Sequence, residues 1–145
     1  ESSALFLTAD GVRRPVIMGS YGIGLGRALA CVVEAHHDER GIAWPAEVAP
    51  YRAHLVAIGA ARNADVAAAA DGLYERLGAA GVAVLYDDRG LSPGVALADA
   101  DLLGMPTILT VSPRSLAAGG VETTDRATGE RAVRPFADVE AALLG

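Results

Sequence analysis

The order of apolar runs in the second half of the chain constrains its fold more than any other feature. Three short runs typical of strands, "AHLVAIG", "VAVLYDD" and "TILTV", alternate with helical patterns over residues 63–81 and 92–104. This order, with short connections, predicts a largely parallel sheet with helices packed against it. We therefore expect an α/β fold with a mixed sheet, extended by a hairpin around residues 127–129 and followed by a terminal helix over "FADVEAALL".

Residues that begin and end helices flank both helical patterns. Asn63 can cap the first helix and Gly81 can end it. Ser92-Pro93 is expected to cap and open the second helix, and Gly104 to close it. The apolar residues of the first helix recur at helical spacing; they are Val66, Ala70, Leu73, Tyr74 and Leu77. The apolar residues of the second helix include Val95, Leu102 and Leu103.

The first third of the chain has a different pattern. The runs "ALFLT" and "RRPVIMGSY" flank Asp10-Gly11, which predicts an antiparallel hairpin. A helix is expected over residues 25–36, with Leu25, Ala28, Leu29, Val32 and Val33 on one buried face. The polar "HHDERG" ends this helix and "IAWPAEVAPYR" follows with two prolines, so we expect one domain over residues 1–48 and another over 49–145.

Composition excludes several classes of protein. The formal net charge of −6 argues against a general nucleic-acid binder, so any RNA contact must be local. All twelve basic residues are arginine, which can make bidentate and stacking contacts. No apolar run is long enough for a membrane span, and no targeting segment is visible. The single cysteine, Cys31, excludes an internal disulfide and is expected in the core, which indicates a reducing compartment, the cytoplasm.

The stretch "GSYGIGLGR" brings three glycines close together before an arginine. Gly22, Gly24 and Gly26 lack a Cβ atom, so a ligand can lie directly on their backbone. The spacing differs from the dinucleotide fingerprint. The alternative interpretation is a strand crowded by its own neighbours. Arg27, in the first turn of the following helix, favours a ligand site.

A second charged stretch, "DDRG", follows the strand that ends near residue 87. Asp87, Asp88 and Arg89 are therefore expected beyond the carboxyl edge of the sheet, where open α/β sheets bind ligands. Carboxylates and a forked guanidinium can hydrogen-bond to base edges. A solvated charged turn is the alternative. The adjacent histidines His36 and His37 have no partners at metal-ligand spacing, so no metal site is expected.

Three ordered stretches resemble the C-terminal part of bacterial-type prolyl-tRNA synthetases, which are class II aminoacyl-tRNA synthetases. They are "GSYGIG" with the following arginine, the connector "HDERGIAWP" with "AP", and the series "DDR", "PGV", "AD" and "LLG". The resemblance covers essentially the whole chain. It implies that the chain is a fragment in which residues 1–48 end the catalytic domain and residues 49–145 form the anticodon-binding domain.

The resemblance implies roles for the glycine-rich stretch. Arg27 matches the arginine of the third class II motif, which lies against bound ATP and offsets charge on its phosphates, without proton transfer. The glycines would form the floor under the aminoacyl adenylate, and the proline pocket would lie near Ser20 and Tyr21. Proline, ATP and Mg²⁺ are implied for the parent protein, with the metal held mainly by phosphates and by carboxylates outside this chain.

The resemblance also implies that the second domain binds the anticodon loop of proline tRNA. The residues expected near the anticodon are Tyr51, Asp87, Asp88, Arg89, Gly94 and Asp99. Tyr51 could stack on a base or pack in the core. Two departures from the family pattern, Ala96 and Thr107, put individual contacts in doubt.

The parent is expected to be a homodimer through its catalytic domain, and this chain alone is expected to be inactive and to bind no cofactor. A synthetase specific for threonine or glycine is one alternative. A non-catalytic RNA-binding module of the same fold is another, and a small nucleotide-binding protein that cradles phosphate with "GIGLGR" is a third.

Overall fold

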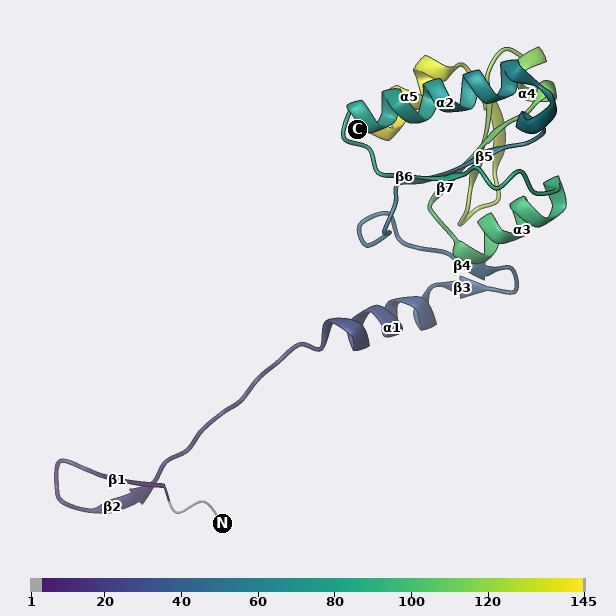
Figure 1. The fold of residues 1–145 in the computed structure, drawn as a ribbon. Helices are drawn as coiled ribbons and strands as arrows, with labels where there is room; N and C mark the ends of the chain where they lie inside the picture. The colour runs from purple at the N-terminus through teal and green to yellow at the C-terminus, as the bar shows by residue number, and fades with distance from the viewer. Residues whose placement is uncertain (1–3, 145) are drawn as a thin grey trace.

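The structure is a computed structural model, which describes residues 4–144. Figure 1 shows two parts: an α/β domain in the later two thirds of the chain, and an N-terminal arm that extends away from it. In the α/β domain, the C-terminal hairpin forms the last two strands of the sheet, and the terminal helix packs on one face of that sheet.

A five-stranded mixed sheet with the order β6-β5-β7-β8-β9 forms the centre of the α/β domain. β5 is parallel to both β6 and β7, whereas β8 and β9 are antiparallel to their neighbours. The expected mixed α/β fold is therefore confirmed, with three parallel strands and a C-terminal hairpin. The strands are β5 (Ala53–Ala57), β6 (Val84–Asp87), β7 (Thr107–Val111), β8 (Val121–Asp125) and β9 (Arg131–Arg134).

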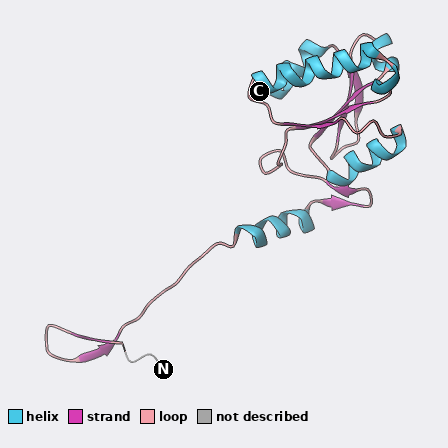
Figure 2. Ribbon diagram, viewed as in Figure 1, coloured by secondary structure: helices cyan, strands magenta, loops and turns pink. Residues whose placement is uncertain are grey.

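Helices cover both faces of this sheet. In Figures 1 and 2, α2 (Ala64–Ala79) and α5 (Phe136–Leu144) lie on one face, and α3 (Pro93–Leu103) lies on the other. The chain moves from β5 outward to β6 through α2, and then back past β5 to β7 through α3. Two crossovers of the same hand in opposite directions must place their helices on opposite faces. Two short elements that the sequence did not predict, η1 (Ala60–Arg62) and α4 (Pro113–Ala117), complete the domain.

The two faces hold cores of different size. The face under α2 and α5 holds the larger one, in which Leu55, Leu73 and Leu109 are fully buried. The face under α3 holds a small one, made by Val56, Ala96, Ala100 and Ile108. Alanine is the buried residue of α3, whereas the leucines at its C-terminal end lie at the surface. Ala96 therefore packs in the core.

The expected helix ends are confirmed in the α/β domain except at Ser92, which directly precedes α3 but whose side chain makes no capping hydrogen bond. The Asn63 side chain caps α2 by accepting hydrogen bonds from the backbone N–H groups of Asp65 and Val66. Gly81 follows the end of α2 with φ +81°, and Gly104 ends α3 with φ +71°. These left-handed conformations explain why glycine stands at both positions.

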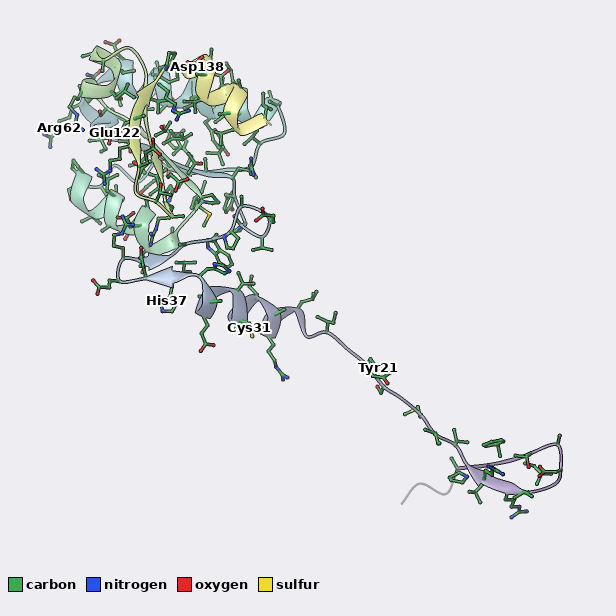
Figure 3. All side chains as sticks on the ribbon, turned by 180° about the vertical axis from the view of Figure 1, so that it is seen from behind. Tyr21, Cys31, His37, Arg62, Glu122 and Asp138 are labelled. Carbon is green, nitrogen blue, oxygen red and sulfur yellow. The ribbon has the colours of Figure 1, made fainter. Side chains whose placement is uncertain are left out.

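The N-terminal arm contains the hairpin β1 (Leu5–Leu7) and β2 (Arg13–Pro15), joined as expected by the Asp10-Gly11 turn, and the helix α1 (Leu25–Ala35). The expected burial of one face of α1 is wrong: none of its residues is buried, and Leu25 is 81% exposed. Cys31 is also exposed rather than in a core. Figure 3 shows Cys31 on α1 and Tyr21 on the extended segment, both apart from the α/β domain. Within the described residues, no other element covers this arm.

A two-stranded hairpin joins the arm to the α/β domain, where the sequence predicted only an irregular path. Its strands are β3 (His37–Asp38) and β4 (Gly41–Ile42). We refer to residues 37–44 as the strap, because they lie across the C-terminal end of α3 (Figure 1). The division of the chain at residue 48 stays a prediction, although the strap packs against the second of these two regions.

Candidate functional site

Three charged side chains meet between the C-terminal end of β6 and α3. The Arg89 guanidinium donates from Nε and Nη2 to the two carboxylate oxygens of Asp87, at 2.8 and 2.7 Å. The same Nη2 donates to Asp99 at 2.8 Å. We call these three residues the arginine cluster. The sequence predicted all three as site residues, and the structure brings them together.

Local structure explains this arrangement. Asp87 is the last residue of β6, and its side chain points to the α3 face of the sheet, where it is only 4% exposed. Its carboxylate also accepts from the backbone N–H of Arg89, which fixes the turn after the strand. Gly90 follows with φ +65° and redirects the chain toward Ser92 and α3. Asp99 then lies on the second turn of α3, beside the returning Arg89 side chain.

The cluster fixes the charges of its members. The hydrogen bonds from Arg89 hold the pKa of the Asp87 carboxyl below its usual value, despite the opposing effect of burial. The bonds to Asp87 and Asp99 raise the pKa of Arg89. Asp87 and Arg89 are therefore both ionised over the physiological pH range. The Arg89 side chain is nevertheless half exposed, at 51%, so this fixed donor is accessible from solvent.

Arg89 of the cluster and the neighbouring Asp88 can recognise a ligand. Within the described part of the chain, no hydrogen bond occupies Nη1 of Arg89 or the exposed carboxylate of Asp88. One is a donor and the other an acceptor, a combination that suits the edge of a nucleic-acid base. Asp87 does not present its carboxylate to a ligand, because its oxygens are already bonded to Arg89.

A hollow of about 450 Å³ lies beside the cluster, between β6 and α3. Its lining includes Asp87, Asp88, Arg89 and Asp99, and its floor includes His54 of β5. The sequence analysis missed His54, which is 1% exposed and whose Nδ1 has no hydrogen-bond partner among residues 4–144. Burial lowers the pKa of His54, so the neutral imidazole is favoured. A lone histidine within the apolar run "AHLVAIG" was the available signal.

The structure does not bring Tyr51 to this cluster. Tyr51 precedes β5, whereas Asp87 ends β6 and pairs in register with Val56. Five residues along a strand correspond to about 16 Å, so Tyr51 lies toward the opposite end of the sheet. Tyr51 is 38% exposed, which is too much for full burial in the core. This exposure does not by itself indicate that a base stacks on the ring. Gly94, in the first turn of α3, lies after the loop that carries Arg89.

The predicted ATP-site residues all lie on the N-terminal arm, away from the cluster. Gly22, Gly24 and Gly26 have ordinary negative φ values or extended backbone, and at Gly22 and Gly26 an added Cβ would meet nothing within 4 Å. Within residues 4–144, no side chain or backbone therefore crowds Gly22 or Gly26, and Gly24 makes only an ordinary contact with Arg27. Residues 16–24 form no strand, contrary to expectation, because no described segment pairs with them. Arg27 is exposed in the first turn of α1.

Ser20 and Tyr21 lie on the same extended segment, and Tyr21 is 98% exposed. Residues 4–144 contain no group of three or more histidine, cysteine, aspartate or glutamate side chains that could hold a metal ion. Among the same residues, no helix has both the length and the apolar character needed to cross a membrane.

Comparison with known proteins identifies the α/β domain. Residues 52–145 match the family model described as "Anticodon binding domain". The chain therefore belongs to the family of anticodon-binding domains.

Curated relatives extend this likeness to the arm. A proline–tRNA ligase from Salinispora tropica is 49% identical over 97% of this chain and 24% of its own length. One from Dehalococcoides mccartyi is 46% identical over 94% of this chain and 24% of its own length. The chain thus spans about a quarter of the length of the curated relatives that it matches.

A solved structure supports the fold. The crystal structure of prolyl-tRNA synthetase from Cryptosporidium parvum, complexed with L-proline and AMP, superposes with a TM-score of 0.72. The match has 24% identity and covers 80% of this chain and 26% of that one. At this identity the likeness shows the architecture alone.

Proposed function

We propose that this chain is the C-terminal part of a proline–tRNA ligase, and that its α/β domain recognises the anticodon of proline tRNA. The observation that carries the proposal is 49% identity to a proline–tRNA ligase over 97% of the chain, which includes both the arm and the domain. A non-catalytic RNA-binding module is not favoured, since the match continues through the arm. Threonine or glycine specificity is not favoured either, because these relatives are proline–tRNA ligases.

Base recognition rests on Arg89 and Asp88 in this proposal. Proline anticodons share two guanines, which offer N7 and O6 as acceptors and the amino and imino groups as donors. Asp87 and Asp99 hold Arg89 through Nε and Nη2, so Nη1 would donate to guanine. Asp88 would accept from the other edge. Asp87 and Asp99 act by holding the guanidinium in place, which lowers the entropy lost when a base binds.

The arm would contribute one edge of the catalytic site of the parent protein. Arg27 would bind ATP and offset negative charge as proline attacks the α-phosphate, an electrostatic role without a general base on this chain. The open space beside Gly22 and Gly26 leaves room for the adenylate on the backbone. Ser20 and Tyr21 would lie near the proline. Exposed apolar side chains such as Ile17 (94%) and Met18 (82%) support packing of the arm against other parts of the parent.

The remaining properties follow from the same proposal. The parent would work with ATP and Mg²⁺ in the cytoplasm and form a homodimer through its catalytic domain. We assign no Mg²⁺ ligand to residues 4–144, where no suitable cluster of side chains occurs. The isolated chain would carry out neither proline activation nor transfer, because the arm alone is exposed and cannot enclose ATP.

The experiment compares Arg89→Ala with Arg114→Ala in the full-length protein that contains this chain. Arg114 is a matched control, since it is also an arginine paired with a carboxylate, Glu122, but is 85% exposed on another part of the domain. One base contact contributes about 1–3 kcal/mol, so Arg89→Ala should lower charging of proline tRNA about ten- to a hundredfold. Arg114→Ala should change it by less than about twofold. Proline activation without tRNA should stay the same in both variants.

Transcripts with either anticodon guanine replaced complete the experiment. Wild type should discriminate strongly against them, and Arg89→Ala should discriminate less against one of the two. If the variant loses charging but keeps the full discrimination of wild type, Arg89 does not recognise the anticodon. A full-length protein that charges no tRNA with proline would show that the proposed function itself is wrong.

A further inference from the structure

A buried arginine outside the candidate site holds the strap against the α/β domain. Arg126 directly follows β8 and is 1% exposed, and its backbone N–H donates to the carbonyl of Pro106. Its Nη1 and Nη2 donate to the two carboxylate oxygens of Asp38, at 2.8 and 2.7 Å, and its Nε donates to the Asp101 carbonyl of α3 at 3.0 Å. One guanidinium thus joins the strap, α3 and the start of the C-terminal hairpin.

The backbone of the strap also touches α3 directly. The Trp44 indole N–H donates to the Leu103 carbonyl at 3.0 Å, and the Trp44 backbone N–H donates to the Gly104 carbonyl at 3.1 Å. A Cβ atom at Gly104 would lie 1.8 Å from the backbone oxygen of Ile42, and one at Gly41 would lie 2.4 Å from Cα of Leu102. The two backbones approach so closely that only glycine fits at these positions.

The strap is also bonded to the end of α1. His36 caps α1 by donating from its backbone N–H to the Val32 carbonyl, and the Ala43 N–H of the strap donates back to the His36 carbonyl at 2.9 Å. The Nδ1 atom of His37 lies 2.9 Å from the Glu34 carbonyl. The end of α1 therefore cannot turn freely while the strap is bound to α3.

α3 consequently carries two sets of contacts within a few residues. Asp99 holds Arg89 in the arginine cluster. Two residues later, the Asp101 carbonyl begins the contacts with Arg126 and the strap. A short rigid path runs from the arginine cluster through α3 and the strap to α1, which carries Arg27 in its first turn.

We propose that Arg126 is a positioning residue for charging. By clamping the strap on α3, it fixes the direction in which α1 and the catalytic part leave the α/β domain. A bound anticodon and the acceptor end of the same tRNA can then meet their two sites together. This inference rests on the proposed function and adds a residue that touches neither ATP, proline nor tRNA.

Two substitutions open the clamp by unrelated means. Gly104→Ala places a methyl group against the strap, and Asp38→Asn removes the charge that Arg126 binds while disturbing the core least, since Asp38 is 40% exposed. Gly119→Ala is the matched control: Gly119 also has a positive φ, +89°, but an added Cβ would meet nothing within 4 Å. The control shares the backbone strain of Gly104→Ala without the collision.

Trp44, the single tryptophan, reports directly on the strap. In the 145-residue chain we expect iodide to quench its fluorescence more strongly in Gly104→Ala and Asp38→Asn than in wild type or Gly119→Ala. In the full-length protein, kcat for charging should fall at least about tenfold in the first two variants, because small misplacements of reacting groups have effects of this size. Proline activation, and the KM for tRNA, should change by less than about twofold. Arg126→Lys, which keeps the charge without the fork, should retain part of the activity.

Several results would overturn the inference. One is unchanged Trp44 quenching in both opening variants, since the clamp would then not hold the strap. Another is exposed Trp44 with normal charging. A third is a rise in KM for tRNA that accounts for the whole loss, since the defect would then lie in anticodon binding. A wild-type protein that charges no proline overturns the proposed function, and this inference with it.

Discussion

Because of Tyr86, the stability of the α/β domain is expected to fall as the pH rises through the alkaline range. It lies on β6, where its hydroxyl donates to the Asp71 carboxylate of α2 at 2.9 Å, and its ring lies 5.4 Å from that of Tyr74. Burial and the hydrogen bond to Asp71 raise its pKa from 10.0 to about 12. The phenolate would lie in a partly buried place facing a carboxylate, so the native state retains a proton that the unfolded state loses.

The sign and the size follow from this difference. A raised folded pKa stabilises the native state fully below the unfolded value of about 10, and the contribution is lost as the pH rises through about 12. A difference of two units corresponds to at most about 2.7 kcal/mol. Because the Tyr86 side chain is only partly buried, solvent screening lowers this, and we expect about 1–2 kcal/mol.

Urea unfolding of the 145-residue chain, followed by circular dichroism, tests this prediction. The chain has no lysine, so the alkaline range is free of lysine titration. Between about pH 9 and about pH 11.5, wild type should lose about 1–2 kcal/mol more unfolding free energy than Tyr86→Phe, which has no hydroxyl. At the lower pH, Tyr86→Phe should be less stable by about 1 kcal/mol, through the lost hydrogen bond. Equal losses in the two proteins would refute the reasoning.

Two further predictions concern stability, with urea unfolding at neutral pH as the measurement. Asn63→Ala should cost about 1 kcal/mol through loss of the α2 cap, whereas Asn63→Asp, which can still accept, should cost only a few tenths. Equal costs would show that the cap does not stabilise α2. Leu73→Ala should cost about 2–5 kcal/mol because Leu73 is fully buried under α2, and Leu102→Ala, at a position that is 58% exposed, should change stability by less than about 0.5 kcal/mol.

Features set by neighbouring residues could be predicted from the sequence. The caps at Asn63, Gly81 and Gly104 depend on local backbone chemistry, and the alternation of strands and helices determined the central sheet. The meeting of Asp87 with Arg89 is also local, because the two are separated by one residue. What could not be predicted was the direction of their bonds, which turn Asp87 inward and leave Arg89 and Asp88 to face solvent.

Features set by distant contacts could not be predicted. Asp38 and Arg126 are 88 residues apart, and neither stands in a pattern that indicates the other. The strap forms its hairpin where its backbone docks on α3. Its own residues do not alternate between apolar and polar, so the sequence did not predict these strands. The apolar spacing of α1 correctly predicted a helix but not its environment, since no described element covers that face.

The acidic character of the chain limits how its α/β domain can bind RNA. The arginine cluster sets two carboxylates against one guanidinium, and Asp88 adds a third negative charge at its rim. Phosphates would be repelled there, whereas base edges, which carry no net charge, can use the Asp88 carboxylate as an acceptor. Under the proposed function, this domain then contributes selectivity with little general affinity.

Most of the affinity must come from contacts elsewhere in the parent, which raise the effective concentration of the anticodon at the cluster. The strap clamped by Arg126 lies at the junction of the two parts. By the inference above, it sets how the acceptor end of a bound tRNA meets the catalytic site, and not how tightly the tRNA binds.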